Sequence, residues 1–167
     1  MSLSFKALVP ALLLSACAGV TTVSEQTTVV CTTDDDRSEM VAKFLDQYAA
    51  GDLSFADEMF ADEVRFYWAT RESSLSEEEW REGMTAQHQV FKGIEWNDRV
   101  VTTGTYPDGL TWTTVWAEWS ALNSSTNEQS KYLIHLAYQW DGDRVSAEYG
   151  FFDRGRYEAE MAAALGQ

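Results

Sequence analysis

Histidine and cysteine are scarce in this chain of 167 residues, which has two of each. Because there is no Cys-x-x-Cys or His-x-x-x-His pair, too few ligands stand at a useful spacing to bind a metal. The phosphate loop, the dinucleotide fingerprint and the Gly-x-Ser-x-Gly turn are missing as well. We therefore expect no metal site and no cofactor.

Basic residues are also few, since 12 lysines and arginines stand against 27 acidic residues and give a net charge of −15. A surface with this balance repels the phosphate backbone of nucleic acids. The sequence therefore predicts no nucleic-acid partner, and the acidic excess otherwise says more about solubility than about chemistry.

The first residues have the composition of a targeting segment. Lys6 precedes an apolar run from Ala7 to Leu14, which is typical of a signal peptide and too short to span a bilayer. The stretch "LSAC", ending at Cys17, resembles a bacterial lipobox, which implies cleavage before Cys17 and acyl chains on its thiol as a membrane anchor. A plain secretory signal with an incidental cysteine is the alternative.

Three segments follow from this division: a signal peptide at 1–16, a lipidated cysteine with a threonine-rich tether at 17–33, and one domain at 34–167. With Cys17 lipidated, one thiol remains, so the mature chain has no intramolecular disulfide. In many Gram-negative lipoproteins, a residue such as Ala18 after the lipidated cysteine accompanies export to the outer membrane. We expect a protein anchored in the bacterial cell envelope, facing the periplasm if the source is Gram-negative.

The domain reads as helices followed by strands. Apolar periodicity and capping residues, with an Asp36/Glu39 pair at the first start and Ser76/Glu79 at another, predict helices at 36–51, 54–60, 76–93 and 156–166. Alternation and turn signals predict strands at 64–69, 95–103, 110–122, 131–140 and 144–152. This order indicates an α+β domain with helices packed on one face of a curved antiparallel meander.

One predicted strand contains "TWTTVWAEWS", with three of the seven tryptophans of the chain. Alternation separates Trp112 and Trp116 on one face from Trp119 on the other. Both faces of the strand carry large side chains, and the sequence leaves open which face lines the interior of the domain.

The stretches "FLDQYAAGDLSFADEMFADEVRFYW" and "YQWDGDRVSAEYGFFD" resemble the cone-shaped nuclear transport factor 2-like superfamily, in its SnoaL-like and ketosteroid-isomerase-like branch. The resemblance spans roughly Ser38 to Leu165 and implies three main helices on a curved antiparallel sheet around a pocket. The superfamily includes enzymes and non-enzymes, so the fold alone does not decide the function.

The resemblance also implies where catalytic groups would stand. The oxyanion-hole tyrosine of ketosteroid isomerases falls on Phe44, their general-base aspartate on Trp68, and their second oxyanion-hole acid on Leu136. None of these three side chains can move a proton or stabilise an enolate. Ketosteroid isomerase activity is therefore rejected.

With these replacements the implied pocket becomes apolar and aromatic. Its predicted ligand-binding residues are Phe44, Trp68, Met84, Leu136 and Phe152. Such a cavity suits a small hydrophobic molecule held without catalysis, which is the leading hypothesis. The alternative is that these side chains simply fill the cone.

Two other functions stay open. His88 is predicted on the inner face of the 76–93 helix with Trp80 and Met84, where Asp153 could orient it as an acid/base pair for a cyclase, isomerase or dehydratase. His135 alternates with inward residues and is expected to face outward. In the other hypothesis, the outer sheet face pairs with a second copy of the chain, because superfamily members often dimerise in this way.

Overall fold

One curved sheet forms the frame of the computed structural model, which describes residues 29–166. Its strand order is β1-β3-β4-β5-β6-β2, and neighbours are antiparallel except for the parallel pair of β2 and β6. The strands are β1 (Cys31–Thr32), β2 (Phe60–Trp68), β3 (Phe91–Thr105), β4 (Thr111–Asn123), β5 (Glu128–Asp141) and β6 (Arg144–Phe151).

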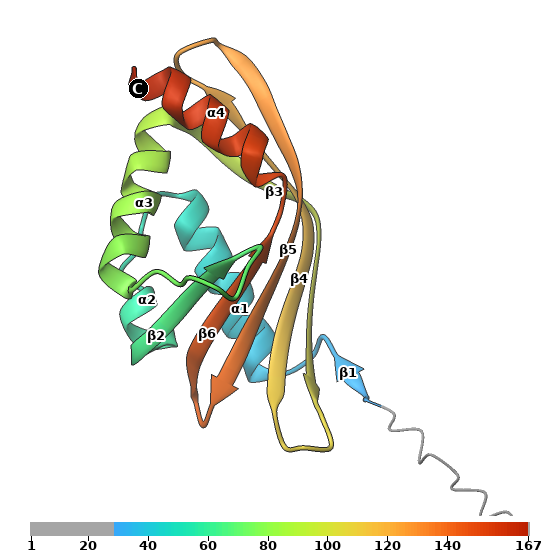
Figure 1. The fold of residues 1–167 in the computed structure, drawn as a ribbon. Coiled ribbons are helices and arrows are strands. Elements are labelled where there is room, and N and C mark those ends of the chain that lie inside the picture. The colour runs from blue at the N-terminus through green and yellow to red at the C-terminus, as the bar shows by residue number, and fades with distance from the viewer. Residues whose placement is uncertain (1–28, 167) are drawn as a thin grey trace, which may run out of the picture.

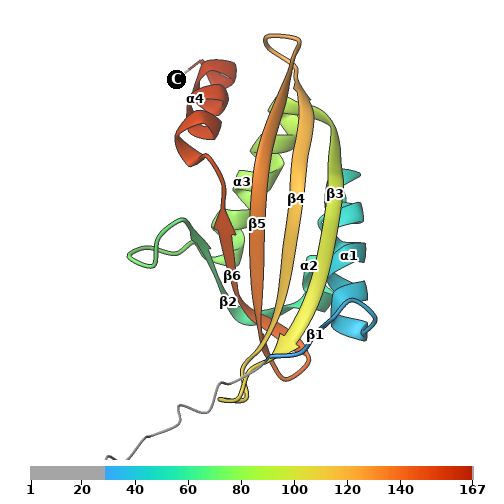
Figure 2. The ribbon, with the colours of Figure 1, turned by 90° about the vertical axis from the view of Figure 1, so that its right-hand side faces the viewer.

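The helices lie on one side of this sheet. They are α1 (Asp36–Ala49), α2 (Ala56–Met59), α3 (Glu77–Val90) and α4 (Arg154–Leu165). The concave face is covered by α1, α2 and α3, while α4 lies across one end of the cone (Figure 1). Figure 2 shows no helix over the opposite face of β3, β4 and β5. The predicted α+β architecture is confirmed.

Capping residues fix where the two long helices begin. The Ser76/Glu79 capping box is present, with the Ser76 Oγ accepting from the Glu79 backbone N–H at 3.3 Å. For α1 the predicted cap is wrong by one residue. Asp35 has extended backbone angles and accepts from the N–H groups of Arg37 and Ser38, whereas Asp36 is already helical.

The first elements differ from prediction at their edges. Strand β2 begins at Phe60 rather than Val64, because a single helical turn at 56–59 is all that precedes it. Cys31 and Thr32, predicted as part of the tether, pair with β3 and form the short edge strand β1. The signal peptide and Cys17 lie outside the described residues.

Aromatic packing joins the helices to the sheet. Trp80 of α3 stacks on Phe66 of β2 with ring centroids 4.9 Å apart, and Phe60 meets both rings edge to face. Such contacts add specific geometry to the burial of large apolar area.

None of the helices within residues 29–166 has the length and apolar character needed to cross a membrane.

Candidate functional site

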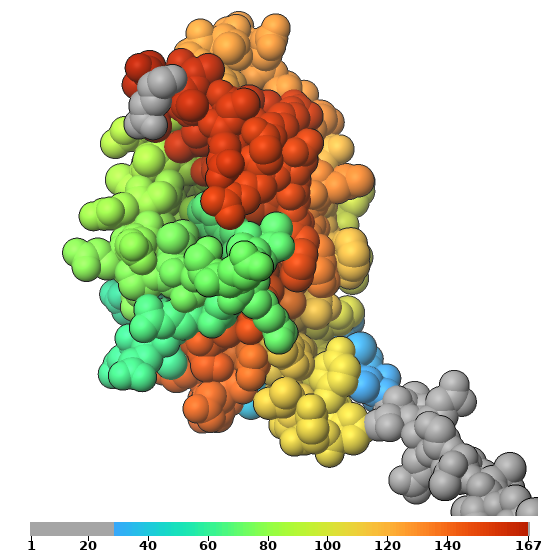
Figure 3. Space-filling model, in the orientation of Figure 1, coloured from blue at the N-terminus to red at the C-terminus, as the bar shows by residue number. Residues whose placement is uncertain are grey.

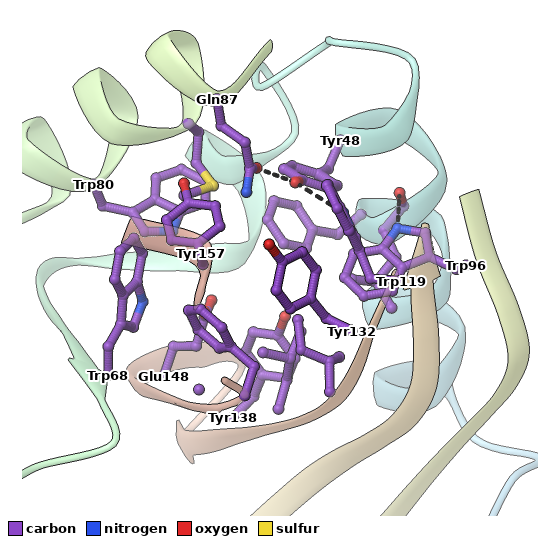
Figure 4. Close-up of a pocket in the computed structure, with 17 residues that line it drawn as sticks. Tyr48, Trp68, Trp80, Gln87, Trp96, Trp119, Tyr132, Tyr138, Glu148 and Tyr157 are labelled. Carbon is purple, nitrogen blue, oxygen red and sulfur yellow. Dashed lines mark hydrogen bonds between the residues drawn. The ribbon is translucent and has the colours of Figure 1, made fainter. Parts of the chain in front are cut away.

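An aromatic cavity of about 70 Å³ lies between the concave sheet face and the helices (Figure 4). Helices α1, α3 and α4 and every strand except β1 contribute to its wall. The lining residues are Phe44, Leu45, Tyr48, Trp68, Trp80, Met84, Gln87, Trp96, Trp119, Tyr132, Ile134, Leu136, Tyr138, Glu148, Gly150, Phe152 and Tyr157.

All five residues predicted to bind a ligand line this cavity: Phe44, Trp68, Met84, Leu136 and Phe152. Three of them stand where the resemblance placed the catalytic groups of ketosteroid isomerases. The cavity therefore has apolar side chains at all three positions, as the alignment implied.

Helix α4 closes one end of the cavity with Tyr157, its most buried residue. The Tyr157 ring packs edge to face against Phe152 at 5.5 Å and Trp68 at 6.4 Å. In Figure 3, α4 and the segment between β2 and α3 cover this side of the molecule. The C-terminal helix thus covers the cavity and leaves the outer sheet face free.

A buried hydrogen-bonded group joins two helices to the sheet beside the cavity. The Tyr48 hydroxyl donates to the Gln87 Oε1, and the Trp119 Nε1–H donates to the Tyr48 oxygen at 3.3 Å (Figure 4). Burial raises the pKa of Tyr48 far above its ordinary value. These three side chains are uncharged and hold one another in place.

His88, predicted on the inner face of α3, packs against α1 beside the cavity, and Gln87, one residue earlier, lines the cavity instead. His88 is half-buried, and its ring lies 5.1 Å from the ring of Tyr48, outside the cavity lining. Burial lowers the pKa of His88, and its Nε2 is buried without a partner among the described residues.

Asp153, the other member of the predicted acid/base pair, is exposed and caps the N-terminus of α4. Its carboxylate accepts from the backbone N–H of Arg156 at 3.1 Å. Neither His88 nor Asp153 lines the cavity, so an acid/base pair formed by these two side chains would act outside it.

Glu148 is an acidic residue of the cavity lining that sequence reasoning missed. It is 6% exposed, lies on β6 in register with Tyr138 and Phe66, and stands among the rings of the pocket (Figure 4). Burial raises the pKa of its carboxyl to about 8. A carboxyl in this environment holds its proton at neutral pH, because the charged form loses its hydration.

A β-bulge turns Glu148 inward. Trp140 pairs with Val145 and Gln139 pairs with Ala147, so Ser146 is an extra residue in β6. Simple alternation from the buried Val145 would have placed Glu148 on the outer face. The bulge shifts the alternation by one residue, and no glycine or turn signal in the sequence announces it.

Two further hydroxyl groups face the same space. Those of Tyr132 and Tyr138 are buried and have no hydrogen-bond partner among residues 29–166, although both side chains line the cavity. Burial raises the pKa of both residues, so they stay protonated at neutral pH. The cavity therefore offers polar groups to a bound molecule on an otherwise apolar wall.

The structure resolves which tryptophans belong to which face. Trp119 is 2% exposed and lines the cavity, whereas Trp116 is 61% exposed on the outer face. The Trp116 ring stacks on His135 at 4.1 Å, which confirms that His135 faces outward. Trp116 and His135 are also in register with Val100 and Phe151, so the four form an outer row across β3, β4, β5 and β6, in which His135 is half-buried and the other three are exposed.

No group of three or more histidine, cysteine, aspartate or glutamate side chains suited to a metal ion occurs within 29–166.

No family model and no curated protein sequence matches the chain. Its likeness to known proteins lies in solved structures.

A protein described as a SnoaL-like polyketide cyclase from Jannaschia is 13% identical, with a TM-score of 0.58, over 76% of this chain and 92% of that one. An NTF2-like protein from Anabaena variabilis is 18% identical, with a TM-score of 0.53, over 68% and 84%. A protein with a ketosteroid isomerase-like fold from Catenulispora acidiphila, solved in complex with trimethylamine, is 9% identical, with a TM-score of 0.55, over 74% and 92%. The chain has the cone-shaped nuclear transport factor 2-like fold.

Proposed function

We propose that the protein binds a small, largely apolar molecule in its aromatic cavity and holds it without covalent chemistry. The observation that carries this proposal is a cavity of about 70 Å³ lined mainly by aromatic rings. The solved structures support a small-molecule site, since one similar protein is described as a polyketide cyclase and another was solved in complex with trimethylamine. An apolar wall with few polar groups is the usual form of a small-molecule site.

Native mass spectrometry of the purified protein tests this function. We expect a species heavier than the bare chain by the mass of one small molecule, lost on denaturation. As a second measurement, Gly150→Ala should lower the ligand-bound fraction, because a Cβ there would stand 3.4 Å from Trp68 and take up cavity space. A bare chain that binds nothing from a library of small ligands would contradict the proposal.

The proposed setting is a membrane surface in the bacterial cell envelope, with acyl chains on Cys17 as the anchor. The lipobox-like "LSAC" supports this assignment. Metabolic labelling with an alkyne-bearing fatty acid should mark the protein, and Cys17→Ser should abolish the label. A labelled Cys17→Ser variant would show that the chains sit elsewhere.

Proton-transfer catalysis is a second candidate function. The residue that supports it is Glu148, not His88 or Asp153. A carboxyl whose pKa is about 8 suits a general base or acid near neutral pH. Exchange of α-deuterium from a deuterated cyclic ketone into water, followed by NMR, would detect it. Wild-type exchange no faster than buffer, or equally fast in Glu148→Gln, would count against this function.

The exposed outer row supports a dimer with a second copy of the chain. Val100, Trp116 and Phe151 are about half exposed or more, in a chain whose net charge is −15. An uncharged stripe is the part of an acidic surface that two copies can bring together with least repulsion, and a two-fold axis would pair it with itself. Sedimentation of the purified protein tests the dimer, which a monomer at tens of micromolar would exclude.

A further inference from the structure

We propose that the cavity selects a small organic cation, a protonated or quaternary amine, with Glu148 as its counter-ion and the surrounding aromatic rings as its cage. This inference rests on the proposed function, because it names the class of ligand that the same cavity would take. It concerns recognition alone and includes no covalent step.

The first support is the position of the Glu148 carboxyl. It stands on the inner face of the sheet with 6% of the residue exposed, where an ionisable group is costly unless something compensates it. None of the ion pairs formed within residues 29–166 includes Glu148, and no hydrogen bond from that part of the chain lowers its pKa. The fold thus places an acid in the cavity without using it structurally.

The second support is the wall around this acid. It presents the rings of Phe44, Trp68, Trp80, Tyr138 and Tyr157. The negative faces of aromatic rings attract cations, and tryptophan is the strongest of them. Aromatic side chains grouped around one carboxylate are the arrangement that recognises alkylammonium groups.

The third support is the distribution of charge. The lining includes no lysine, arginine or histidine, so nothing in the described wall competes for Glu148. The chain as a whole carries −15, which attracts cations and repels anions. The free hydroxyl of Tyr138 can accept an N–H from a protonated amine, whereas a hydrocarbon ligand would leave this hydroxyl and Glu148 unused.

The size of the cavity limits the ligand. Its volume of about 70 Å³ is roughly half that of an engineered apolar cavity of about 150 Å³ that admits benzene. The structure therefore fits a compact group of a few heavy atoms, such as a methylated ammonium.

Binding should depend on pH, because Glu148 must lose its proton to pair with a cation. The other titratable groups of the cavity lining are tyrosines, namely Tyr48 from α1, Tyr138 and Tyr132 from β5, and Tyr157 from α4, and all have a raised pKa. The Glu160 carboxylate of α4 lies beside Tyr132, outside the lining. Strand β2 and helix α3 contribute only uncharged side chains to the lining, and the acidic residues of α2 are exposed. Glu148 is therefore the group that titrates between pH 6 and 8 inside the cavity.

Isothermal titration calorimetry of the purified protein tests the inference, with methylammonium as the probe and methanol as a neutral molecule of similar size and shape. The probe stays protonated from pH 6 to pH 8, so any pH dependence belongs to the protein. We expect methylammonium to bind at least about tenfold more tightly than methanol at pH 8, and its affinity to fall about tenfold from pH 7 to pH 6. Buffers of different ionisation enthalpy should show release of about one proton at pH 6.

Glu148→Gln should abolish both the preference for the cation and the pH dependence. The matched control is Glu95→Gln, which removes the same charge from an exposed position of β3 and should change neither. If wild type binds methanol as tightly as methylammonium, the cavity binds small molecules but does not select cations, and the inference fails while the proposed function stands. If wild type binds neither probe and carries no small molecule in native mass spectra, both fail.

Discussion

Trp119 and Trp116 stand three residues apart on β4, yet their surroundings have little in common. Trp119 is buried, donates a hydrogen bond to Tyr48 and walls the cavity. Trp116 is 61% exposed, and its packing partner is the ring of His135. The two faces of one sheet are thus both aromatic, but one face lines a cavity and the other is exposed.

The comparison teaches that aromatic content does not identify a binding cavity. What separates the inner face is its polar groups, since Glu148 and the hydroxyls of Tyr132 and Tyr138 point to a ligand with charge or hydrogen-bonding capacity. The polar side chain of the outer row is His135, whose Nδ1 lies 3.1 Å from the Val115 carbonyl oxygen. Substitutions on the two faces should therefore differ in kind as well as in size.

Trp119→Ala should have the largest effect on stability. Removing a fully buried indole leaves a void, which lowers the free energy of unfolding by roughly 3–5 kcal/mol, and the Tyr48 oxygen loses a donor. Urea unfolding followed by circular dichroism measures the change. A loss no greater than that of Trp116→Ala would contradict the contrast between the two faces.

Glu148 should make stability fall as pH rises. Its pKa is about 8 in the folded chain against an ordinary 4.5, so between these values the folded state keeps a proton that the unfolded state loses. The free energy of unfolding then decreases by up to about 1.4 kcal/mol per pH unit across that window and levels off above pH 8.

Urea titrations of wild type and Glu148→Gln from pH 5 to pH 9 measure this dependence as a difference between the two proteins. His88 and His135 have a lowered pKa and act in the opposite direction below pH 6.5, but their contributions cancel in the difference. Parallel curves for the two proteins would show that the Glu148 carboxyl is not buried as described.

Tyr48→Phe should cost about 1–3 kcal/mol of unfolding free energy, because it leaves the buried Gln87 Oε1 and Trp119 Nε1 without their partner. The control is Tyr67→Phe on the outer face, where the ring stacks on Tyr149 and should keep doing so. Equal losses for the two variants would refute a special role for the buried hydrogen bonds.

Trp116→Ala should have the smallest effect on the stability of the single chain, within about 0.5 kcal/mol, because the residue is exposed. Its effect should appear in assembly instead, as a shift of the sedimentation coefficient from dimer toward monomer. A large loss of stability without any change in assembly would place Trp116 in the core rather than at an interface.

Much of the fold follows from local signals in the sequence. The Ser76/Glu79 box places the start of α3, and alternation in "TWTTVWAEWS" separates Trp116 from Trp119. The resemblance supplied the cavity positions, such as Phe44 and Trp68. Helical spacing could not choose between Gln87 and His88, because neighbouring positions at the edge of an apolar face differ by only about 100° around the helix.

The sequence by itself determined the order of the elements and which side chains of β4 share a face, because hydrophobic periodicity and caps act within a few residues. The tertiary structure alone decided which face of β4 is inside, since both faces are apolar and the packing of α1 and α3 makes the choice. It also decided where Glu148 points. A bulge at Ser146 depends on how β6 pairs with β5, and that pairing turns an acid of ordinary appearance into the buried carboxyl of the cavity.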